Sequence, residues 1–156
     1  MKNKKKKVCF AASSGGHFEQ LMMLKPLMEQ YDSFIITEKT SYHTKVDGQR
    51  MYYQKQINRK EKLVLLKLFC NLVTSLYIFI KERPDVVITT GVLAMIPISV
   101  IAKKCGKKLI YIESFAKVNS PTKTGRYLYK YADLFYVQWE TMLEIYPDAI
   151  YLGAIY

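Results

Sequence analysis

The stretch from Val8 to His17 constrains the fold more than any other part of this 156-residue chain. The apolar run VCFAA leads into Ser-Ser-Gly-Gly-His, and apolar residues at helical spacing follow directly. This order predicts a buried strand, a tight turn and a first helix, as at the start of an α/β nucleotide-type domain. Glycines let a backbone lie close to a ligand, and N–H groups at a helix start favour phosphate. We therefore expect Ser14, Gly15 and Gly16 to bind phosphate, with His17 as a titratable group beside them.

The glycine turn differs from the dinucleotide-binding fingerprint. That fingerprint requires three glycines in the spacing G-x-G-x-x-G and an acidic residue about 20 positions later. Here two glycines are adjacent, the third is missing, and Glu38 alone stands at the acidic position, so NAD binding is disfavoured. A structural alternative stays open, in which the turn only joins strand to helix and His17 caps the helix.

Short strand-like runs recur along the chain with helical stretches between them. Runs such as VVIT, LIYI and LFYV are apolar on both faces, as a parallel sheet covered on both sides requires. The pattern predicts a single α/β domain over residues 1–156, a Rossmann-like, doubly wound and mostly parallel sheet. The expected strands are Lys7–Ala12, Ser33–Thr37, Met51–Gln54, Val86–Thr89, Leu109–Ile112, Leu134–Val137 and Ala149–Leu152.

Two further loops follow expected strands and are candidates for the same site. Ligands of such sheets bind at the carboxyl ends of the strands. There Thr90 and Gly91 offer backbone N–H groups, and Ser114 a hydroxyl, for binding phosphate. Glu113 carries a carboxylate that could act as a base, and the alternative is a salt bridge to a nearby lysine.

The segment Leu63–Ile80 is nearly all apolar and lies between two expected strands. Its length is at the lower limit for crossing a bilayer, but crossing there would divide the sheet. A buried crossover helix is the first interpretation, although a helix on a sheet normally has a polar outer face, which this segment lacks. Its outer face is therefore expected to rest on a membrane or on a partner protein, with flanking lysines suited to anionic headgroups.

Composition points to an anionic partner. The net charge is +11, and basic clusters include Lys4–Lys7, residues 59–62 and residues 103–108. Such an excess favours nucleic acid, an acidic membrane surface or a phosphorylated substrate. The sequence contains no recognisable nucleic-acid-binding motif, so we expect no nucleic acid partner. Three widely spaced cysteines indicate a reducing, cytoplasmic environment, and Asp-x-Asp spacing is absent, so no metal is implied.

Four blocks in order resemble one family. The blocks VCFAASSGGHFEQL, TTGVLAMIPISVIAKKCGKKLIYIES, YLYKYADLFYVQWE and YLGAIY are similar to the Alg14-type proteins over essentially the whole chain. Bacterial relatives are the short capsule and exopolysaccharide glycosyltransferase subunits of the PssD and Cps14F type. The chain also resembles, more distantly, the N-terminal, acceptor-binding half of GT-B glycosyltransferases such as MurG, which share a glycine turn ending in Gly-Gly-His.

The resemblance implies one subunit of a split glycosyltransferase. This half would bind a polyprenyl-diphosphate-linked saccharide at the cytoplasmic membrane face, peripherally attached. A separate Alg13-like subunit would bind the UDP-sugar donor, and no other cofactor is implied. By motif position, His17 or Glu113 would be catalytic and accept the proton of the attacking sugar hydroxyl. Eukaryotic members carry an N-terminal membrane anchor, whereas this chain has only lysines there.

The apolar end of the chain is a candidate partner interface. Ile155 and Tyr156 are expected to dock on the donor-binding subunit, because apolar side chains are disfavoured in water. Two other hypotheses remain open. The chain could be a non-catalytic activator or membrane scaffold of a partner glycosyltransferase, or a stand-alone nucleotide-binding protein.

Overall fold

The computed structural model describes residues 5–41, 45–58 and 61–156. Seven strands form one sheet in which every pairing is parallel, in the order β3-β2-β1-β4-β5-β6-β7. All seven expected strands are present within one or two residues of their predicted ends. They are β1 (Lys7–Ala11), β2 (Asp32–Lys39), β3 (Arg50–Lys55), β4 (Val86–Thr89), β5 (Lys108–Ile112), β6 (Leu134–Val137) and β7 (Ile150–Tyr151).

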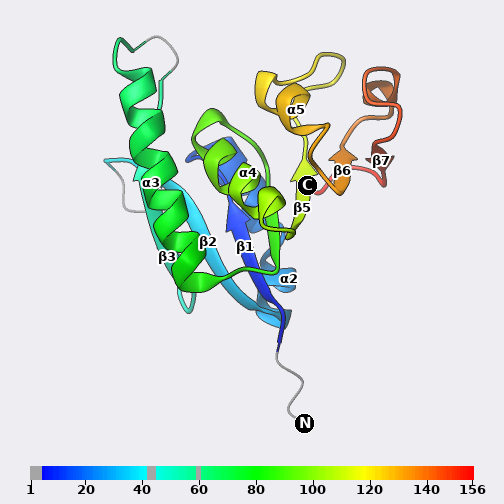
Figure 1. The fold of residues 1–156 in the computed structure, drawn as a ribbon. Helices are drawn as coiled ribbons and strands as arrows, with labels where there is room; N and C mark the ends of the chain where they lie inside the picture. Colours follow the sequence, from blue (N-terminus) through cyan, green and yellow to red (C-terminus); the bar gives the residue numbers. More distant parts are fainter. Residues whose placement is uncertain (1–4, 42–44, 59–60) are drawn as a thin grey trace.

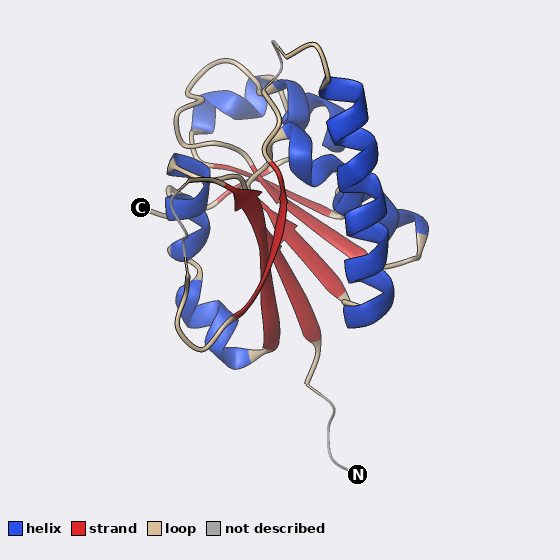
Figure 2. Ribbon diagram, turned by 90° about the vertical axis from the view of Figure 1, so that its left-hand side faces the viewer, coloured by secondary structure: helices blue, strands red, loops and turns tan. Residues whose placement is uncertain are grey.

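Helices cover both faces of the sheet, as Figure 2 shows. One layer holds α3 (Val64–Glu82), α4 (Ile96–Lys104) and α5 (Lys123–Leu128), which lie in front of the sheet in Figure 1. The other holds α1 (Gly16–Met22) and α2 (Lys25–Gln30). Two short 3₁₀ helices, η1 (Leu93–Met95) and η2 (Glu140–Glu144), complete the elements. Each layer closes its own apolar core against the sheet, and the predicted doubly wound, Rossmann-like fold is confirmed.

The first helical stretch is divided. The apolar pattern from Phe18 to Met28 predicts one helix, but α1 ends at Met22 and α2 begins at Lys25. Pro26 occupies the first turn of α2, where its missing N–H and fixed φ are tolerated. Continuing α1 through that position would remove a hydrogen bond and force a clash one turn earlier. The single-helix prediction is therefore wrong, and proline is the physical reason.

Helix α3 has its polar residues turned inward. Asn71 and Ser75 are fully buried, and their side chains bind the edge strand β3. The Asn71 amide donates to the Lys55 carbonyl at 2.8 Å and accepts from the Lys55 N–H at 2.9 Å. The Ser75 hydroxyl accepts from the Gln54 amide at 2.6 Å. These contacts replace the missing neighbour of an edge strand and fix α3 along it.

The opposite side of α3 is apolar and faces away from the sheet. Leu65 is 82% exposed, and eight further large apolar side chains of this segment are at least 43% exposed. The prediction of an apolar outer face is confirmed, whereas a fully buried crossover helix is not found. The exposed residues are Leu63, Leu65, Leu66, Phe69, Leu72, Val73, Leu76, Tyr77 and Ile80.

Candidate functional site

The carboxyl ends of β1 and β4 meet at the point where the chain order of the sheet reverses. Strand β1 pairs with β2 on one side and with β4 on the other. Ligands of open α/β sheets bind in the crevice outside such a switch point. His17 follows β1 and Thr90 follows β4, and the Thr90 hydroxyl donates to the His17 carbonyl oxygen at 3.0 Å. The two predicted loops are therefore brought together and joined directly.

The glycine turn has the geometry that its residues predict. Gly15 has φ +74°, a left-handed conformation that favours glycine, and its carbonyl accepts from the Phe18 N–H at 2.8 Å. Gly15 and Gly16 are exposed, and a Cβ added to either would meet nothing within 4 Å. The turn is therefore open to an approaching ligand. Ser14, half-buried, precedes it.

His17 is half-buried and does not cap α1. Gly15 is the N-cap residue of that helix, and no side chain caps it. The Nδ1 atom of His17 is buried without a hydrogen-bond partner among the described residues. Burial lowers the pKa of His17 below its usual value, while the Thr90 backbone and the Glu113 carboxylate act in the opposite direction. A neutral imidazole at this place can accept a proton.

The loop after β4 is held in an unusual backbone conformation. Gly91 has φ +99°, and Val92 has φ +80°, which is rare for a β-branched residue. A Cβ at Gly91 would lie 2.6 Å from the Tyr111 hydroxyl oxygen, so only glycine fits there. The Gly91 N–H already donates to the Thr89 hydroxyl at 3.1 Å. These contacts give the loop a structural function, and its expected binding of phosphate stays a prediction.

Glu113 is the centre of a buried hydrogen-bond network. Its side chain is 1% exposed, and its carboxylate accepts from the Tyr146 hydroxyl at 3.1 Å and from the Thr122 hydroxyl at 2.9 Å. The Tyr111 hydroxyl lies 3.5 Å away, and the backbone N–H groups of Ser114 and Thr122 donate at 2.9 and 3.3 Å. Hydrogen bonds, not the expected lysine, stabilise this carboxylate among the described residues.

The network changes the titration of its tyrosines. Burial and the nearby Glu113 charge raise the pKa of Tyr111 well above its usual value. The same two causes raise the pKa of Tyr146. Both hydroxyls therefore remain protonated donors to Glu113.

Two buried glutamines, neither of them predicted as a site residue, complete the site. The amides of Gln20 and Gln138 both donate to the Glu113 carbonyl oxygen, at 3.1 and 2.8 Å. Gln20 lies on α1, so this pair connects the glycine turn to the ends of β5 and β6. The only signal in the sequence is the position of Gln138 directly after β6.

Glu38 supports the loop after β3. Its carboxylate accepts from the Ile57 N–H at 3.2 Å and is 7% exposed. Burial raises its pKa, partly offset by hydrogen bonds from the backbones of Ile57 and Ser14. In a dinucleotide-binding domain the carboxylate at this position binds the ribose. Here the Glu38 carboxylate accepts hydrogen bonds from the protein's own backbone.

The last residues fold back toward the glycine turn. The Ile155 N–H donates to Gln138 Oε1 at 3.1 Å, and Ile155 packs against the core under α1. The Tyr156 ring lies 5.0 Å from the Phe115 ring, and its hydroxyl is 3.5 Å from the Gly16 carbonyl oxygen. An apolar cavity of about 280 Å³ opens beside this tail, and Leu152 on its margin is 81% exposed.

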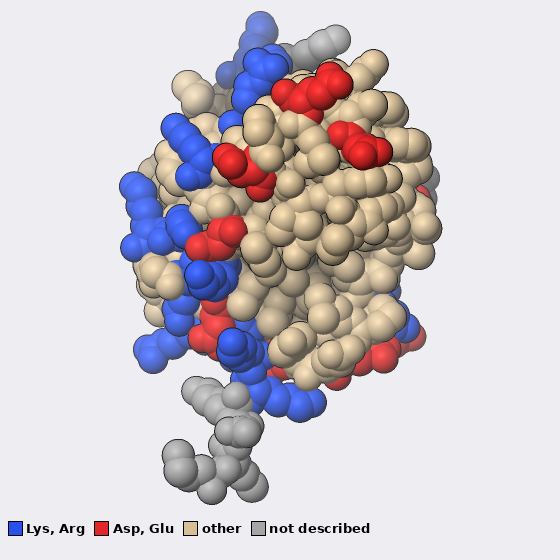
Figure 3. Space-filling model, turned by 90° about the vertical axis from the view of Figure 1, so that its right-hand side faces the viewer, with Lys and Arg blue, Asp and Glu red and all other residues tan. Residues whose placement is uncertain are grey.

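Charge is unevenly distributed over the surface. Figure 3 shows Lys and Arg gathered along one margin of the face viewed there, with Asp and Glu among them, and a large uncharged area beside them. Of the predicted basic clusters, Lys4, Arg59 and Lys60 lie outside the described residues, as does His43. Within the described ranges, no three His, Cys, Asp or Glu side chains come together as a metal site would require.

The family follows from a match that spans nearly the whole chain. The sequence model described as "Oligosaccharide biosynthesis protein Alg14 like" matches residues 8–155. The chain belongs to this family. The Alg14-like resemblance of the four sequence blocks is thereby confirmed.

Curated relatives share the name of a transferase subunit. The chain is 30% identical over 125 residues to the UDP-N-acetylglucosamine transferase subunit ALG14 of Mus musculus, an overlap of 76% of this chain and 56% of the mouse protein. It is 37% identical over 81 residues to the same subunit of Homo sapiens, covering 48% of this chain and 38% of the human protein. The chain thus matches between about a third and a little over half of these relatives' lengths.

Solved structures show the same fold in larger proteins. Acinetobacter baumannii MurG superposes with a TM-score of 0.71 at 15% identity, over 87% of this chain and 42% of MurG. Staphylococcus aureus MnaA, solved with UDP, gives 0.70 at 13% identity, over 96% of this chain and 44% of MnaA. The Alg14-like chain therefore has the fold of one half of a GT-B protein.

Proposed function

We propose that this Alg14-like chain is the acceptor-binding, membrane-associating subunit of a two-component glycosyltransferase. It would act with a separate, Alg13-like subunit that binds the UDP-sugar. Two facts support a divided enzyme: the relatives are named as transferase subunits, and the chain corresponds to less than half of MurG. The acceptor would be a polyprenyl-diphosphate-linked saccharide, used in capsule or exopolysaccharide synthesis.

The outward apolar face of α3 is the observation that carries the membrane association. The helix is long and apolar enough to cross a bilayer, and most of its residues are not buried. Its polar side is nevertheless bound to β3 through Asn71 and Ser75, which favours a helix lying on the membrane. A continuous apolar surface of this kind marks an interaction site in a soluble domain. We place the chain peripherally at the cytoplasmic face, where an anionic leaflet would attract its positive charge.

The proposed chemistry is transfer of the sugar to an acceptor hydroxyl. His17 would accept the hydroxyl proton while that oxygen attacks the anomeric carbon of the donor sugar. The bond from this carbon to UDP breaks, and UDP leaves with the electron pair. The half-buried, neutral imidazole beside the open glycine turn supports this role. The exposed Gly15 and Gly16 would hold the acceptor diphosphate through their N–H groups, with Ser14 beside them.

Glu113 is better placed as a positioning residue than as the base. Its carboxylate is buried and accepts hydrogen bonds from Tyr146 and from Thr122, which it holds at the start of α5. Its charge also acts on His17. Thr90 and Ser114 would keep the neighbouring loops in place for the diphosphate.

A second candidate function is a non-catalytic activator or membrane scaffold of a partner glycosyltransferase. The observation that favours it is the engagement of Glu113, Gly91 and Thr90 in contacts within the protein. Under that hypothesis the membrane face of α3 and the C-terminal tail would be sufficient for function.

A reconstitution assay tests the proposal. Transfer of radiolabelled sugar from UDP-sugars to membrane lipid acceptors is measured with this chain, with a candidate Alg13-like partner, and with both. We expect transfer only with both, and loss of at least about a hundredfold in His17→Gln, in the range of removing a general base. His43→Gln is the matched control. The scaffold hypothesis would be supported instead if the partner alone transferred sugar and the wild-type chain and the His17→Gln variant raised its rate equally.

A further inference from the structure

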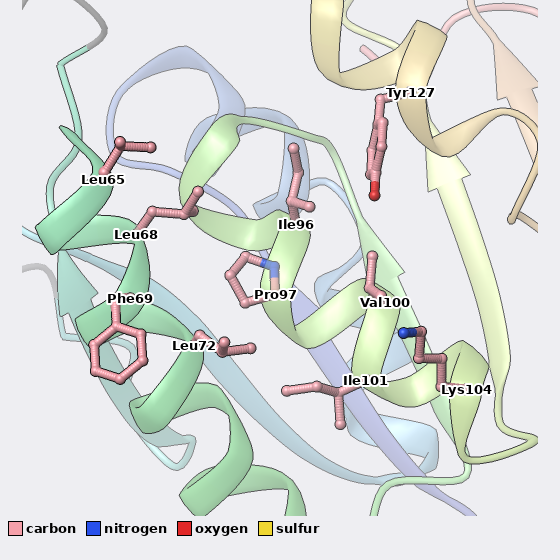
Figure 4. Close-up of a pocket in the computed structure, with 10 residues that line it drawn as sticks. All are labelled: Leu65, Leu68, Phe69, Leu72, Ile96, Pro97, Val100, Ile101, Lys104 and Tyr127. Carbon is pink, nitrogen blue, oxygen red and sulfur yellow. The ribbon is translucent and has the colours of Figure 1, made fainter.

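An apolar groove runs between α3 and α4 and opens to the surface. It has a volume of about 440 Å³ and is lined by Leu65, Phe69 and Leu72 from α3 and by Val100 and Ile101 from α4, among others. Figure 4 shows Leu72 and Ile101 pointing toward one another across the space between the two helices, with Leu65 and Leu68 directed toward α4. The volume lies in the range of pockets that hold small apolar ligands.

The groove is distinct from the candidate catalytic site. The site residues His17 and Glu113 do not line it, and it extends along the length of α4 as far as Lys104. It belongs instead to the same surface as the exposed face of α3. A flat apolar face could rest on a bilayer, but a concave groove leaves room for one separate apolar chain.

The charges at the groove identify the chemistry of its occupant. Of the described residues in the lining, Lys104 alone is charged, and it stands at the margin that Tyr127 also borders. Lys130 stands beside them, with its ammonium 5.5 Å from the centre of the Tyr127 ring. Among the described residues, no acidic side chain lines the groove. An apolar channel with a cationic margin is complementary to an amphiphile with an anionic head.

These two lysines differ from their neighbours in having no counter-charge. Lys103 and Lys108 both pair with Asp133, at 2.7 and 3.4 Å. Lys104 and Lys130 form no ion pair in the part of the chain that the structure describes. Lys104 is exposed, and Figure 4 shows its ammonium directed toward the groove.

We propose that the groove between α3 and α4 binds one anionic phospholipid. One acyl chain would lie along the groove between Leu65 and Ile101, and the phosphate would contact Lys104, Lys130 and the Tyr127 hydroxyl. The inference rests on the proposed membrane association. It adds a defined lipid site to that association and is separate from the site for the acceptor.

Photo-crosslinking in vesicles tests the proposal. The full chain is bound to phosphatidylcholine vesicles that contain a trace of phosphatidylglycerol or phosphatidylcholine with a diazirine in the acyl chain. The labelled peptides are identified, and the amount of label in each is divided by the amount of vesicle-bound chain. Differences in overall membrane binding then do not affect the comparison. We expect phosphatidylglycerol to label α3 and α4 residues of the groove at least about tenfold more than phosphatidylcholine.

Matched variants separate the groove from the rest of the face. Leu65→Glu and Leu66→Glu make the same change at neighbouring exposed positions, and only Leu65 lines the groove. We expect Leu65→Glu to lower groove labelling per bound chain about tenfold, and Leu66→Glu to leave it unchanged. The pair Lys104→Gln with Lys130→Gln should remove the preference for phosphatidylglycerol, whereas Lys81→Gln, at the far end of α3, should keep it. These exposed positions carry little folding risk.

Two results would overturn the proposal. Label spread evenly along the exposed side of α3, with equal effects of the two leucine variants, would mean that the face lies in the bilayer without a lipid site. Absence of label from the groove in vesicle-bound protein would mean that something else covers it, such as a partner protein. Both readouts are independent of sugar transfer, so a failure of the transfer assay leaves this test intact.

Discussion

The Thr90 hydroxyl donates a hydrogen bond of 3.0 Å to the His17 carbonyl oxygen, so the loops after β4 and β1 are joined at the switch point. Thr90 is fully buried. Thr90→Val removes the hydroxyl donor and leaves the His17 carbonyl oxygen without this hydrogen bond. The free energy of unfolding should fall by about 1–3 kcal/mol as a result. Transfer activity in the complex should fall with it, because the glycine turn loses its support. Urea unfolding and the transfer assay measure the two effects.

A second buried threonine supplies the control for this prediction. The Thr124 hydroxyl has no hydrogen-bond partner among the described residues. Thr124→Val should therefore cost about 0 kcal/mol or stabilise slightly, because an unsatisfied polar atom is removed. Thr90→Ser should keep most of the activity. Equal losses in Thr90→Val and Thr124→Val would show that the bond between the loops is unimportant.

Glycine is predicted to be required at position 125 for stability, because a larger residue there would collide with Glu113. A Cβ at Gly125 would overlap Glu113 Oε2 and lie 2.8 Å from the Thr122 hydroxyl oxygen. Gly125→Ala should lower the free energy of unfolding by about 1–3 kcal/mol, the usual cost of overpacking. Glu113→Ala should cost about 3 kcal/mol, because several buried donors lose their acceptor.

The double variant tests whether the two residues act on one another. With Glu113 truncated, the added methyl group of Gly125→Ala loses its closest clash and keeps only the 2.8 Å contact with the Thr122 hydroxyl oxygen, so its cost should fall. A coupling free energy of about 1 kcal/mol or more in a double-mutant cycle is expected. Additive losses would mean that the strain lies elsewhere in α5.

Local sequence patterns predicted the strands well and the first helix less well. Runs such as Val86–Thr89 and Leu134–Val137 are β-branched or aromatic and bounded by breaks, and their observed limits agree with the prediction. The division of α1 from α2 was foreseeable from Pro26 alone. Helical periodicity counts apolar positions and takes no account of where one proline falls, so the two short helices were read as one.

The orientation of α3 and the Glu113 network could not be read from sequence. Asn71 and Ser75 appear as polar interruptions of an apolar run, and only the position of β3 shows that they face inward. The partners of the Glu113 carboxylate lie up to 33 residues away in sequence, and Gln20, which binds the Glu113 carbonyl oxygen, is 93 residues away. No local spacing in the sequence encodes such contacts, so the alternative of a lysine partner for Glu113 rested on charge alone.

The pH dependence of transfer should follow His17. Its pKa lies below the ordinary 6.5 because burial disfavours the charged imidazole. A catalytic base must be neutral, so kcat/KM should stay constant as pH falls through 6.5 and decline only below the lowered pKa. His17→Gln should abolish this acid limb, and His43→Gln should keep it. Persistence of the acid limb in His17→Gln would assign it to another group.

The lowered pKa of His17 should also make the stability of the folded chain depend on pH, with lower stability at lower pH. Below the ordinary pKa of histidine, the unfolded chain binds a proton at position 17 before the folded chain does. The free energy of unfolding therefore falls as pH decreases through this window. His17→Gln should flatten that part of the profile in denaturant titrations. NMR titration of the imidazole, assigned with His43→Gln, measures the pKa directly.

The C-terminal tail is predicted to hold the donor-binding subunit. Ile155 is anchored through its N–H to Gln138, which also binds Glu113, so the tail is built on the candidate site. Tyr156 packs on Phe115 yet remains 57% exposed, which leaves an aromatic surface for a partner. Deleting Ile155 and Tyr156 should abolish co-purification with the partner while the chain stays folded, as circular dichroism would show. Leu63→Gln, a change of exposed apolar surface next to α3, is the control and should retain the partner. Full co-purification after the deletion would contradict the assignment, because the remaining tail would then suffice for binding.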